Sequence, residues 1–339
     1  MKKLLLILLC LPFIGFGQNV NIPDANFKAY LVGEPSINTN GDSEIQVGEA
    51  IVFNGTINCY NLNIYDLTGI EYFSNLTNLS CGNNLLTSLD VSNNTALTYL
   101  FCDNNQLTSL NVSINTSLTT LRCMNNQLTS LDVSYNANLD WLSCSNNQLT
   151  SLDVSYNANL DWLSCSNNQL TSLNVSANIA LTKLWCNDNQ LTSLDVSANT
   201  ALTDFQCHSN QLTSLDVSNN TALTYFSCDS NQLTSLDLRN GNNTNLSYYV
   251  FSSTGNPSLN CISVDDDAWS TANWTVANGN IDPHQYFSNN CAGTAIQEHH
   301  SNKELLKVTD LLGREAKQNN QPLFYIYDDG TIEKRIVIE

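Results

Sequence analysis

The sequence predicts a mostly β repeat solenoid in which every coil carries short strands on both of its sides. The first observation is a strict spacing, because eight cysteines follow one another at intervals of 21 residues. The second is the unit around them, LTSLDVSxNxxLxxLxCxxNQ, whose first copy starts at Leu86. The third is that each unit contains two similar halves of about ten residues, which leaves no room for a helix of average length.

Both halves of the unit carry the pattern of a known family. Residues 97–105 match L-x-x-L-x-C-x-x-N, and residues 86–94 match L-x-x-L-x-V-x-x-N. Over residues 59–254 the chain therefore resembles the leucine-rich repeat family, in its bacterial short-repeat subclass. The resemblance implies coils stacked at about 4.8 Å, the spacing of neighbouring strands. Stacking is needed because one coil cannot bury its own leucine face.

The composition fits a repeat whose polarity comes from Asn, Ser and Thr. Only 13% of the residues are charged, against about 25% in a typical globular protein. In the family, the Asn after the Cys turns the chain and binds backbone groups, whose burial without partners costs about 1–3 kcal/mol each. The charges are 12 Lys and Arg against 31 Asp and Glu, a net charge of −19. This excludes nucleic acid and anionic membrane surfaces as partners, because both need basic residues.

The cysteines of the repeat predict a ladder of buried thiols. They occupy a hydrophobic position of successive strands, where Cβ atoms lie farther apart than the roughly 3.8 Å that a disulfide prefers. A metal site of stacked thiolates is the alternative, but the CxxC pairs and histidines of a zinc site are missing. The ladder consists of Cys81, Cys102, Cys123, Cys144, Cys165, Cys186, Cys207 and Cys228. By contrast, Cys261 and Cys291 follow the repeat and are expected to form a disulfide in a C-terminal cap, residues 255–291.

Residues 18–58 predict a small helical N-terminal cap, with a short capped helix that begins near Pro23. The loop over residues 38–49 resembles a calcium loop of EF-hand or dockerin type. The candidate ligands are Asn38, Asn40, Asp42, Glu44 and Glu49. A structural Ca²⁺ would be the one cofactor that the sequence suggests. The alternative is a polar turn between two cap helices.

The two ends of the chain predict export. Residues 1–17 have the charged and apolar regions of a signal peptide, and no later stretch is apolar enough to span a membrane. Residues 292–304 form a linker, and residues 305–339 form a β-rich tail. In that tail, Asp329-Gly330 between two alternating apolar runs predicts a hairpin.

The tail resembles the type A C-terminal sorting domain of cargo of the type IX secretion system. The matching motifs are D-L-L-G-R-E at 310–315, L-F-Y-I-Y-D-D-G-T at 323–331 and K-R-I-V-I-E at 334–339. The resemblance implies that secretion machinery carries the protein through the outer membrane of a Gram-negative bacterium. The tail would then be cleaved, which leaves the protein either released or attached to the cell surface.

The outward positions of the Cys half vary from coil to coil, which makes this half the candidate binding face. Aromatic residues are enriched in protein interfaces, but they also stack on sugars, and they can simply cover neighbouring coils. The opposite half carries a column of Asp and Asn, which we expect to be solvated; weak cation binding is the alternative. The candidate ligand-binding residues are Tyr99, Phe101, Arg122, Trp141, Trp162, Lys183, Trp185 and Tyr225.

Enzyme motifs are absent from the sequence. It contains no Ser, His and Asp in the order of a hydrolase, no phosphate-binding glycine loop and no HExxH. We therefore expect a non-enzymatic leucine-rich repeat protein, secreted or on the outer cell surface, that mediates protein–protein interaction or adhesion. The alternative is a carbohydrate-binding module that uses the aromatic rim.

Overall fold

The computed structural model describes residues 17–246, 250–291, 305–309, 323–327 and 332–335. The chain forms two compact units that divide between Asn289 and Asn290. The first unit holds the solenoid and its caps, and the second holds the C-terminal strands. The predicted linker and almost all of the predicted signal peptide lie outside the described residues.

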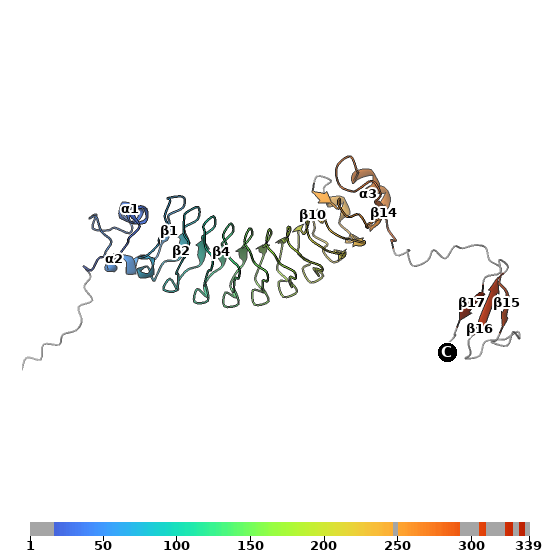
Figure 1. Ribbon diagram of the computed structural model, residues 1–339, viewed down its shortest axis with the longest axis horizontal. Coiled ribbons are helices and arrows are strands. Elements are labelled where there is room, and N and C mark those ends of the chain that lie inside the picture. The colour runs from blue at the N-terminus through green and yellow to red at the C-terminus, as the bar shows by residue number, and fades with distance from the viewer. Residues whose placement is uncertain (1–16, 247–249, 292–304, 310–322, 328–331, 336–339) are drawn as a thin grey trace, which may run out of the picture. The chain divides into compact units, whose positions relative to one another are not determined.

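A ten-stranded parallel sheet runs along one side of the solenoid, and each coil contributes one strand of two or three residues (Figure 1). We call this side the Cys side, because each of the strands β2–β8 and β10 is followed at once by a ladder cysteine. The strand order follows the chain, and the register is strict: Leu142 pairs with Leu121 on one side and with Leu163 on the other. The predicted repeat solenoid is confirmed. The strands are β1 (Thr56–Asn58), β2 (Asn78–Ser80), β3 (Tyr99–Phe101), β4 (Thr120–Arg122), β5 (Trp141–Ser143), β6 (Trp162–Ser164), β7 (Lys183–Trp185), β8 (Asp204–Gln206), β10 (Tyr225–Ser227) and β12 (Phe251–Ser252).

The core is a column of apolar side chains inside the coils. In one coil, Leu149, Val154, Leu160, Leu163 and Cys165 all have an exposed fraction of zero. Each coil thus contributes a small apolar set that only its neighbours can cover, which is why the solenoid needs many coils.

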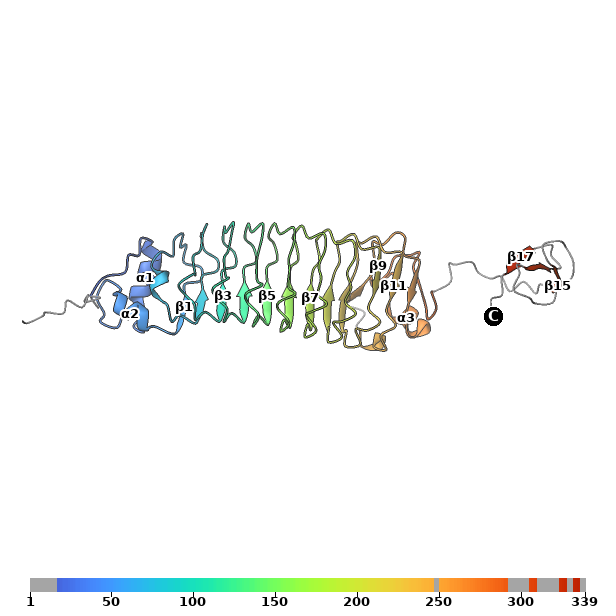
Figure 2. The same cartoon turned by 90° about the horizontal axis from the view of Figure 1, so that it is seen from below.

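The opposite side of each coil, which we call the Asp side, differs from the prediction of strands in every coil. A second sheet occurs only near the C-terminal end, in the order β14-β13-β11-β9. In an earlier coil the chain turns directly after Val154, where the backbone N–H of Asn157 donates to the Val154 carbonyl at 3.0 Å. Figure 2 shows the strands of the Cys side along one edge of the solenoid. The second sheet consists of β9 (Ser214–Asp216), β11 (Ser235–Asp237), β13 (Cys261–Ser263) and β14 (Tyr286–Ser288).

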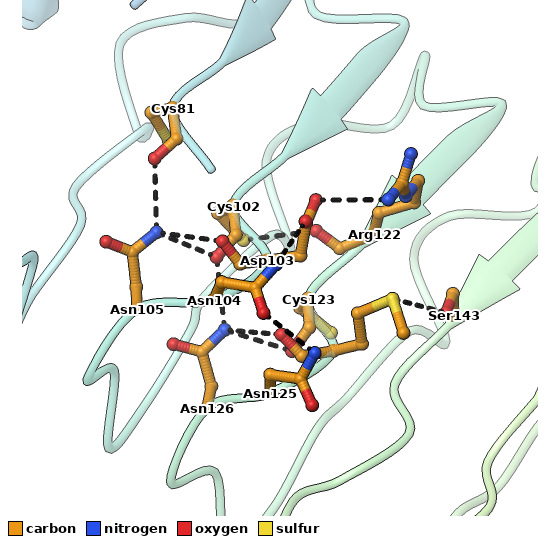
Figure 3. Close-up of polar contacts among 11 residues, drawn as sticks. Cys81, Cys102, Asp103, Asn104, Asn105, Arg122, Cys123, Asn125, Asn126 and Ser143 are labelled. Carbon is orange, nitrogen blue, oxygen red and sulfur yellow. Dashed lines mark hydrogen bonds and ion pairs between the residues drawn. The ribbon is translucent and has the colours of Figure 1, made fainter. Parts of the chain in front are cut away.

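Buried asparagines connect the coils on the Cys side. The side-chain amide of Asn105 donates to the carbonyls of Cys81 and Cys102, both at 3.1 Å. Its oxygen accepts the Leu86 N–H at 3.0 Å. Asn126 makes the same contacts one coil later (Figure 3). The predicted role of this Asn is therefore confirmed: it satisfies buried backbone groups of its own coil and of the preceding one.

The residue before each of these asparagines has a second role that the sequence analysis missed. Asn104 and Asn125 have φ angles of 55° and 54°, in the left-handed region that Asn tolerates better than other side chains do. Asp188 and Ser209 hold the same conformation in later coils. The first Asn of each N-N-Q therefore makes the turn, and the second binds the coils together.

The N-terminal cap contains α1 (Ala25–Gly33) and α2 (Val47–Val52), and the 3₁₀ turn η1 (Ile70–Tyr72) follows. Asp24 begins α1 by accepting the N–H groups of Asn26 and Phe27, both at 2.9 Å, which confirms the predicted helix start. Phe27 and Leu31 are fully buried against the solenoid core.

The C-terminal cap contains α3 (Asp267–Asn273), and the 3₁₀ turn η2 (Asn243–Asn245) lies before it, at the end of the repeat. Trp274 is fully buried, and its ring centroid lies 4.5 Å from that of Phe251 and 5.6 Å from that of Phe287. This tryptophan closes the apolar end of the last coil.

The second unit contains three strands, β15 (Leu305–Thr309), β16 (Leu323–Tyr327) and β17 (Ile332–Arg335). They form an antiparallel sheet in chain order. β16 and β17 pair on either side of the predicted Asp329-Gly330 turn, which itself lies outside the described residues.

Candidate binding faces

The candidate residues of the Cys side lie in two columns on the outer surface of the sheet. Strand register places Trp141 between Thr120 and Trp162, as the sequence columns predict. Together the outward side chains of β2–β8 and β10 make up what we call the Cys-side face. The first column is Asn78, Tyr99, Thr120, Trp141, Trp162, Lys183, Asp204 and Tyr225, and the second is Ser80, Phe101, Arg122, Ser143, Ser164, Trp185, Gln206 and Ser227.

Three tryptophans and a lysine form a compact cluster on this face. The rings of Trp141 and Trp162 are stacked, with centroids 4.5 Å apart and an angle of 8° between their planes. Trp185 meets Trp162 edge-on at 4.9 Å, and the Lys183 ammonium lies 4.4 Å from the Trp162 centroid. The ammonium is thus held by a cation–π contact.

A second cluster lies closer to the N-terminus. The Arg122 guanidinium lies 5.2 Å from the Phe101 ring centroid and 3.5 Å from a carboxylate oxygen of the buried Asp103 (Figure 3). Tyr99 meets Phe101 edge-on at 6.3 Å. The structure therefore joins seven of the eight predicted residues into two clusters. The eighth, Tyr225, lies three strands beyond Trp162 and is exposed.

The indole N–H groups of the three tryptophans have no hydrogen-bond partner. The Nε1 atoms of Trp141, Trp162 and Trp185 are all buried and unsatisfied. An unpaired buried donor costs about 1–3 kcal/mol.

The cysteine ladder lies beneath the Cys-side face, and its thiols are protonated and unreactive. Burial raises the pKa of the Cys144 and Cys186 thiols to about 12, so both are neutral at physiological pH. Cys186 donates a weak S–H hydrogen bond to the Gln206 carbonyl at 3.5 Å. Thiols in this state pack as small hydrophobic groups and lack the thiolate needed for nucleophilic or metal chemistry. Outside the ladder, Cys261 and Cys291 are each disulfide-bonded.

The predicted calcium ligands do not form one ligand set. Glu49 accepts the backbone N–H groups of Thr39 at 2.7 Å and of Gln46 at 3.0 Å, and Glu44 pairs with Lys28 at 2.7 Å. Asn38 points its amide at the carbonyls of Val32 and Asp42, and Asp42 accepts hydrogen bonds from Asn40 and Gln46. Over the described parts of the chain, no three His, Cys, Asp or Glu side chains are grouped as a metal site would require. The arrangement is that of the polar turn.

The Asp side carries a second candidate face. We use the name Asp-side face for its carboxylate column and for the variable column three residues farther on. Tyr135 and Tyr156 have exposed fractions of 59% and 62%, and Ile114 has 52%. A groove of about 600 Å³ runs past Asp132, Tyr135, Asp153 and Tyr156. The carboxylate column is Asp90, Asn111, Asp132, Asp153, Asn174, Asp195, Asp216 and Asp237, and the variable column is Asn93, Ile114, Tyr135, Tyr156, Ala177, Ala198 and Asn219.

The Asp half is nearly constant in sequence, so its column predicted solvated carboxylates and gave no sign of the exposed tyrosines beside it. One position, the residue after Val-Ser, changes from Asn to Ile to Tyr to Ala, and that variation was the available signal. No helix in the described residues is long and apolar enough to cross a membrane.

No protein-family model matches the chain, and no curated protein matches it. Three solved structures from Listeria monocytogenes are similar to it. The functional domain of InlJ, which includes a cysteine ladder, is 33% identical with a TM-score of 0.51, and the match covers 73% of this chain and 67% of that one. The internalin InlF is 18% identical with a TM-score of 0.53, covering 72% of this chain and 84% of that one. The internalin InlC2 is 22% identical with a TM-score of 0.52, covering 73% and 98%.

The InlF and InlC2 similarities show a shared fold alone. The InlJ similarity combines a higher identity with a cysteine ladder, which this chain builds from nine buried free thiols. Two findings therefore agree, the 21-residue solenoid with its asparagine and cysteine ladders and the match to two thirds of the InlJ domain. The chain belongs to the leucine-rich repeat proteins.

Proposed function

We propose that this protein is a non-enzymatic interaction protein that binds an extracellular protein through the Cys-side face. The observation that carries the proposal is the cluster of Trp141, Trp162, Lys183 and Trp185 on a regular sheet. Solenoids use extended surfaces of this kind for binding. Trp and Arg are also the residues that dominate the free energy of protein interfaces.

The fold itself does not require these side chains. At the position of Trp141 and Trp162, another coil has Thr120, and at the position of Trp185 another has Ser143. Those coils keep the same strand register and the same buried leucines. The tryptophans are therefore additions to a coil that closes without them.

Carbohydrate binding is the alternative, and the geometry favours it less. A sugar stacks on a free aromatic ring face. Trp162 has one ring face against Trp141, and the Lys183 ammonium lies over its ring as well. The exposed tyrosines Tyr99 and Tyr225 remain for a sugar, but they lie in strands far apart in the sheet.

The experiment compares the full chain with the variant W141T/W162T/W185S on an array of extracellular proteins and on a glycan array. The replacements copy Thr120 and Ser143, so the fold should remain intact, as circular dichroism and thermal melting can verify. We expect protein binders that weaken about 30-fold or more in the variant. The variant Y135A/Y156A, on the Asp side, is the matched control and should bind them normally. Binding to glycans alone, or unchanged binding by the tryptophan variant, would contradict the proposal.

We further propose that the protein reaches the outer surface of a Gram-negative bacterium or the medium through its C-terminal tail. The sorting motifs and the antiparallel pairing of β15, β16 and β17 support this. The test is a fluorescent protein behind a signal peptide, with and without residues 292–339, in a bacterium that has type IX secretion. Export that depends on the tail and on the secretion system supports the proposal. Retention of both fusions in the periplasm contradicts it.

A further inference from the structure

The Asp-side face carries charges that its local structure does not need. Asp132 and Asp153 each accept the N–H of the Ser two residues later at 2.9 Å. Asn111 and Asn174 occupy the same column and accept the corresponding N–H at 3.0 Å. An amide oxygen is therefore sufficient for the turn. The turn therefore does not require the extra negative charge, and like charges in neighbouring coils repel each other.

Hydrogen bonds nevertheless stabilise the ionised form of these carboxylates. Hydrogen bonds from the Ser134 side chain and backbone hold the pKa of Asp132 below its usual value, against an opposing effect of Asp153. Ser155 does the same for Asp153. Both groups are thus ionised throughout the physiological pH range.

The tyrosines of this face are likewise unnecessary for the coil. Ala177 and Ala198 stand at the position of Tyr135 and Tyr156 in later coils, where the buried Asn178 and Asn199 make the same bridging hydrogen bonds as Asn157. Tyr135 and Tyr156 instead expose most of their surface beside the groove that contains Asp132 and Asp153.

No positive charge balances the face where the tyrosines lie. In the described residues between 59 and 254, the cationic side chains are Arg122, Lys183 and Arg239. The first two lie on the Cys-side face. Arg239 pairs with Asp237 in the last part of the Asp side. A partner for the groove must therefore bring its own positive charge.

We propose that the Asp-side face around Tyr135 and Tyr156 is a second binding surface, for a lysine- and arginine-rich segment of another protein. The alkyl stems of Lys and Arg lie well on tyrosine rings, with cation–π attraction, while their charged ends reach the carboxylates of Asp132 and Asp153. Ile114, in the next coil, continues the exposed apolar ridge for the rest of such a segment. The carboxylates and the tyrosine rings of this face are therefore complementary to the same two kinds of side chain in the partner, Lys and Arg.

The test measures the fluorescence anisotropy of a labelled peptide of alternating Lys and Ser with the full chain, against a matched Gln and Ser peptide. We expect the lysine peptide alone to bind, with an affinity that falls as salt rises. The variants D132N/D153N and Y135A/Y156A should each weaken binding about tenfold or more. Both copy residues of other coils, so folding is preserved, and W141T/W162T/W185S should bind the peptide like the unmodified protein.

Three outcomes would overturn the proposal. Equal binding of both peptides would show that charge plays no part. Binding that survives D132N/D153N and Y135A/Y156A would place the peptide elsewhere. Complete displacement of the peptide by millimolar calcium, with calcium binding that is itself lost in D132N/D153N, would assign the carboxylates to a metal ion. None of these results depends on the Cys-side proposal, which fails or stands with the tryptophan variant.

Discussion

The two sides of each coil solve the same stacking problem in different ways. On the Cys side, backbone ladders and fully bonded asparagines such as Asn147 join the coils. On the Asp side of the earlier coils, the connection is made by the amide of asparagines such as Asn157, whose oxygen has no partner. Beneath the Cys side lie ionisable thiols, and beneath the Asp side lie valines that cannot ionise.

The difference separates stability from surface chemistry. The Cys side has the denser hydrogen bonding, so it offers a rigid base for aromatic residues that must hold their positions. The Asp side has fewer hydrogen bonds between its coils and a column of negative charges in six of eight coils. We therefore expect changes in the interior to act most strongly on the Cys side, and changes of the Asp-side surface to alter binding without altering the fold.

The largest expected effect is alkaline unfolding driven by the Cys side. The folded thiols have raised pKa values, about 12 for Cys59, Cys144 and Cys186. The unfolded chain therefore loses their protons first, from about pH 8.5. Stability is complete below that pH and falls as the pH rises toward the folded pKa, by about 1.4 kcal/mol per pH unit for each thiol. Nine such thiols are buried, and the free energy of unfolding that they lose together over about two pH units exceeds the stability of about 5–15 kcal/mol of a typical domain.

Urea midpoints measured from neutral pH to pH 11 under reducing conditions should therefore fall steeply. Cys144→Ala removes one thiol, so the free energy of unfolding should fall less steeply with pH, by about 1.4 kcal/mol per pH unit. Val133→Ala in the same coil changes the buried interior of the Asp side and should leave the pH dependence of stability as it is. A midpoint that stays constant up to pH 11 would show that the thiols are not buried as described.

The next effect compares the two asparagine ladders. Asn147→Ala removes the acceptor of the Leu128 N–H and the donor to the carbonyls of Cys123 and Cys144. It should lower the free energy of unfolding by about 3 kcal/mol or more, because buried partners are left unpaired. Asn157→Ala also leaves two carbonyls unpaired, but it removes an oxygen that had no partner. Its cost should be smaller by about 1 kcal/mol or more, as chemical denaturation can determine.

The sequence predicted most of this architecture because the repeat averages out local ambiguity. The spacing of Cys144 and Cys165 determined the register, and the outward columns of the Cys side followed from it. Other features depended on contacts that a linear pattern does not contain. The repeat pattern identified the bridging Asn147, but nothing in it showed that Asn146 would take a left-handed conformation. The exposure of Tyr135 became evident only when the turn after Val133 was in place.

The N-terminal loop shows the same limit and supplies a smaller prediction. Oxygen-bearing side chains at calcium-loop spacing are also what a hydrogen-bonded turn requires. Burial alone would raise the pKa of Glu49, but hydrogen bonds from Gln46, Thr39 and Asn40 outweigh it and lower that pKa. Its contribution to stability is therefore present above the unfolded pKa of about 4.3 and is lost as the pH falls.

We expect Glu49→Ala to cost about 1–2 kcal/mol, because it removes the capping box of α2 and the anchor of the loop. Calcium at millimolar concentration should leave the melting temperature of the unmodified protein where it is in EDTA. A rise of the melting temperature with calcium that disappears in Glu49→Ala would restore the EF-hand interpretation of this loop.

The smallest expected effect on stability belongs to the Asp-side face, and it tests whether that face is separate from the fold. Asp132→Asn keeps the acceptor for the Ser134 N–H and removes one charge from the column. The lost charge-assisted hydrogen bond and the relieved repulsion from Asp153 act in opposite directions, so the urea midpoint at neutral pH should stay unchanged within error. Below the unfolded pKa of about 3.9, the unmodified protein should lose the small stabilisation by this carboxylate, whereas the variant should not. A clear loss of stability at neutral pH would mean that the carboxylate column is a structural feature of the coil, and its retention in six of eight coils would then need no ligand to explain it.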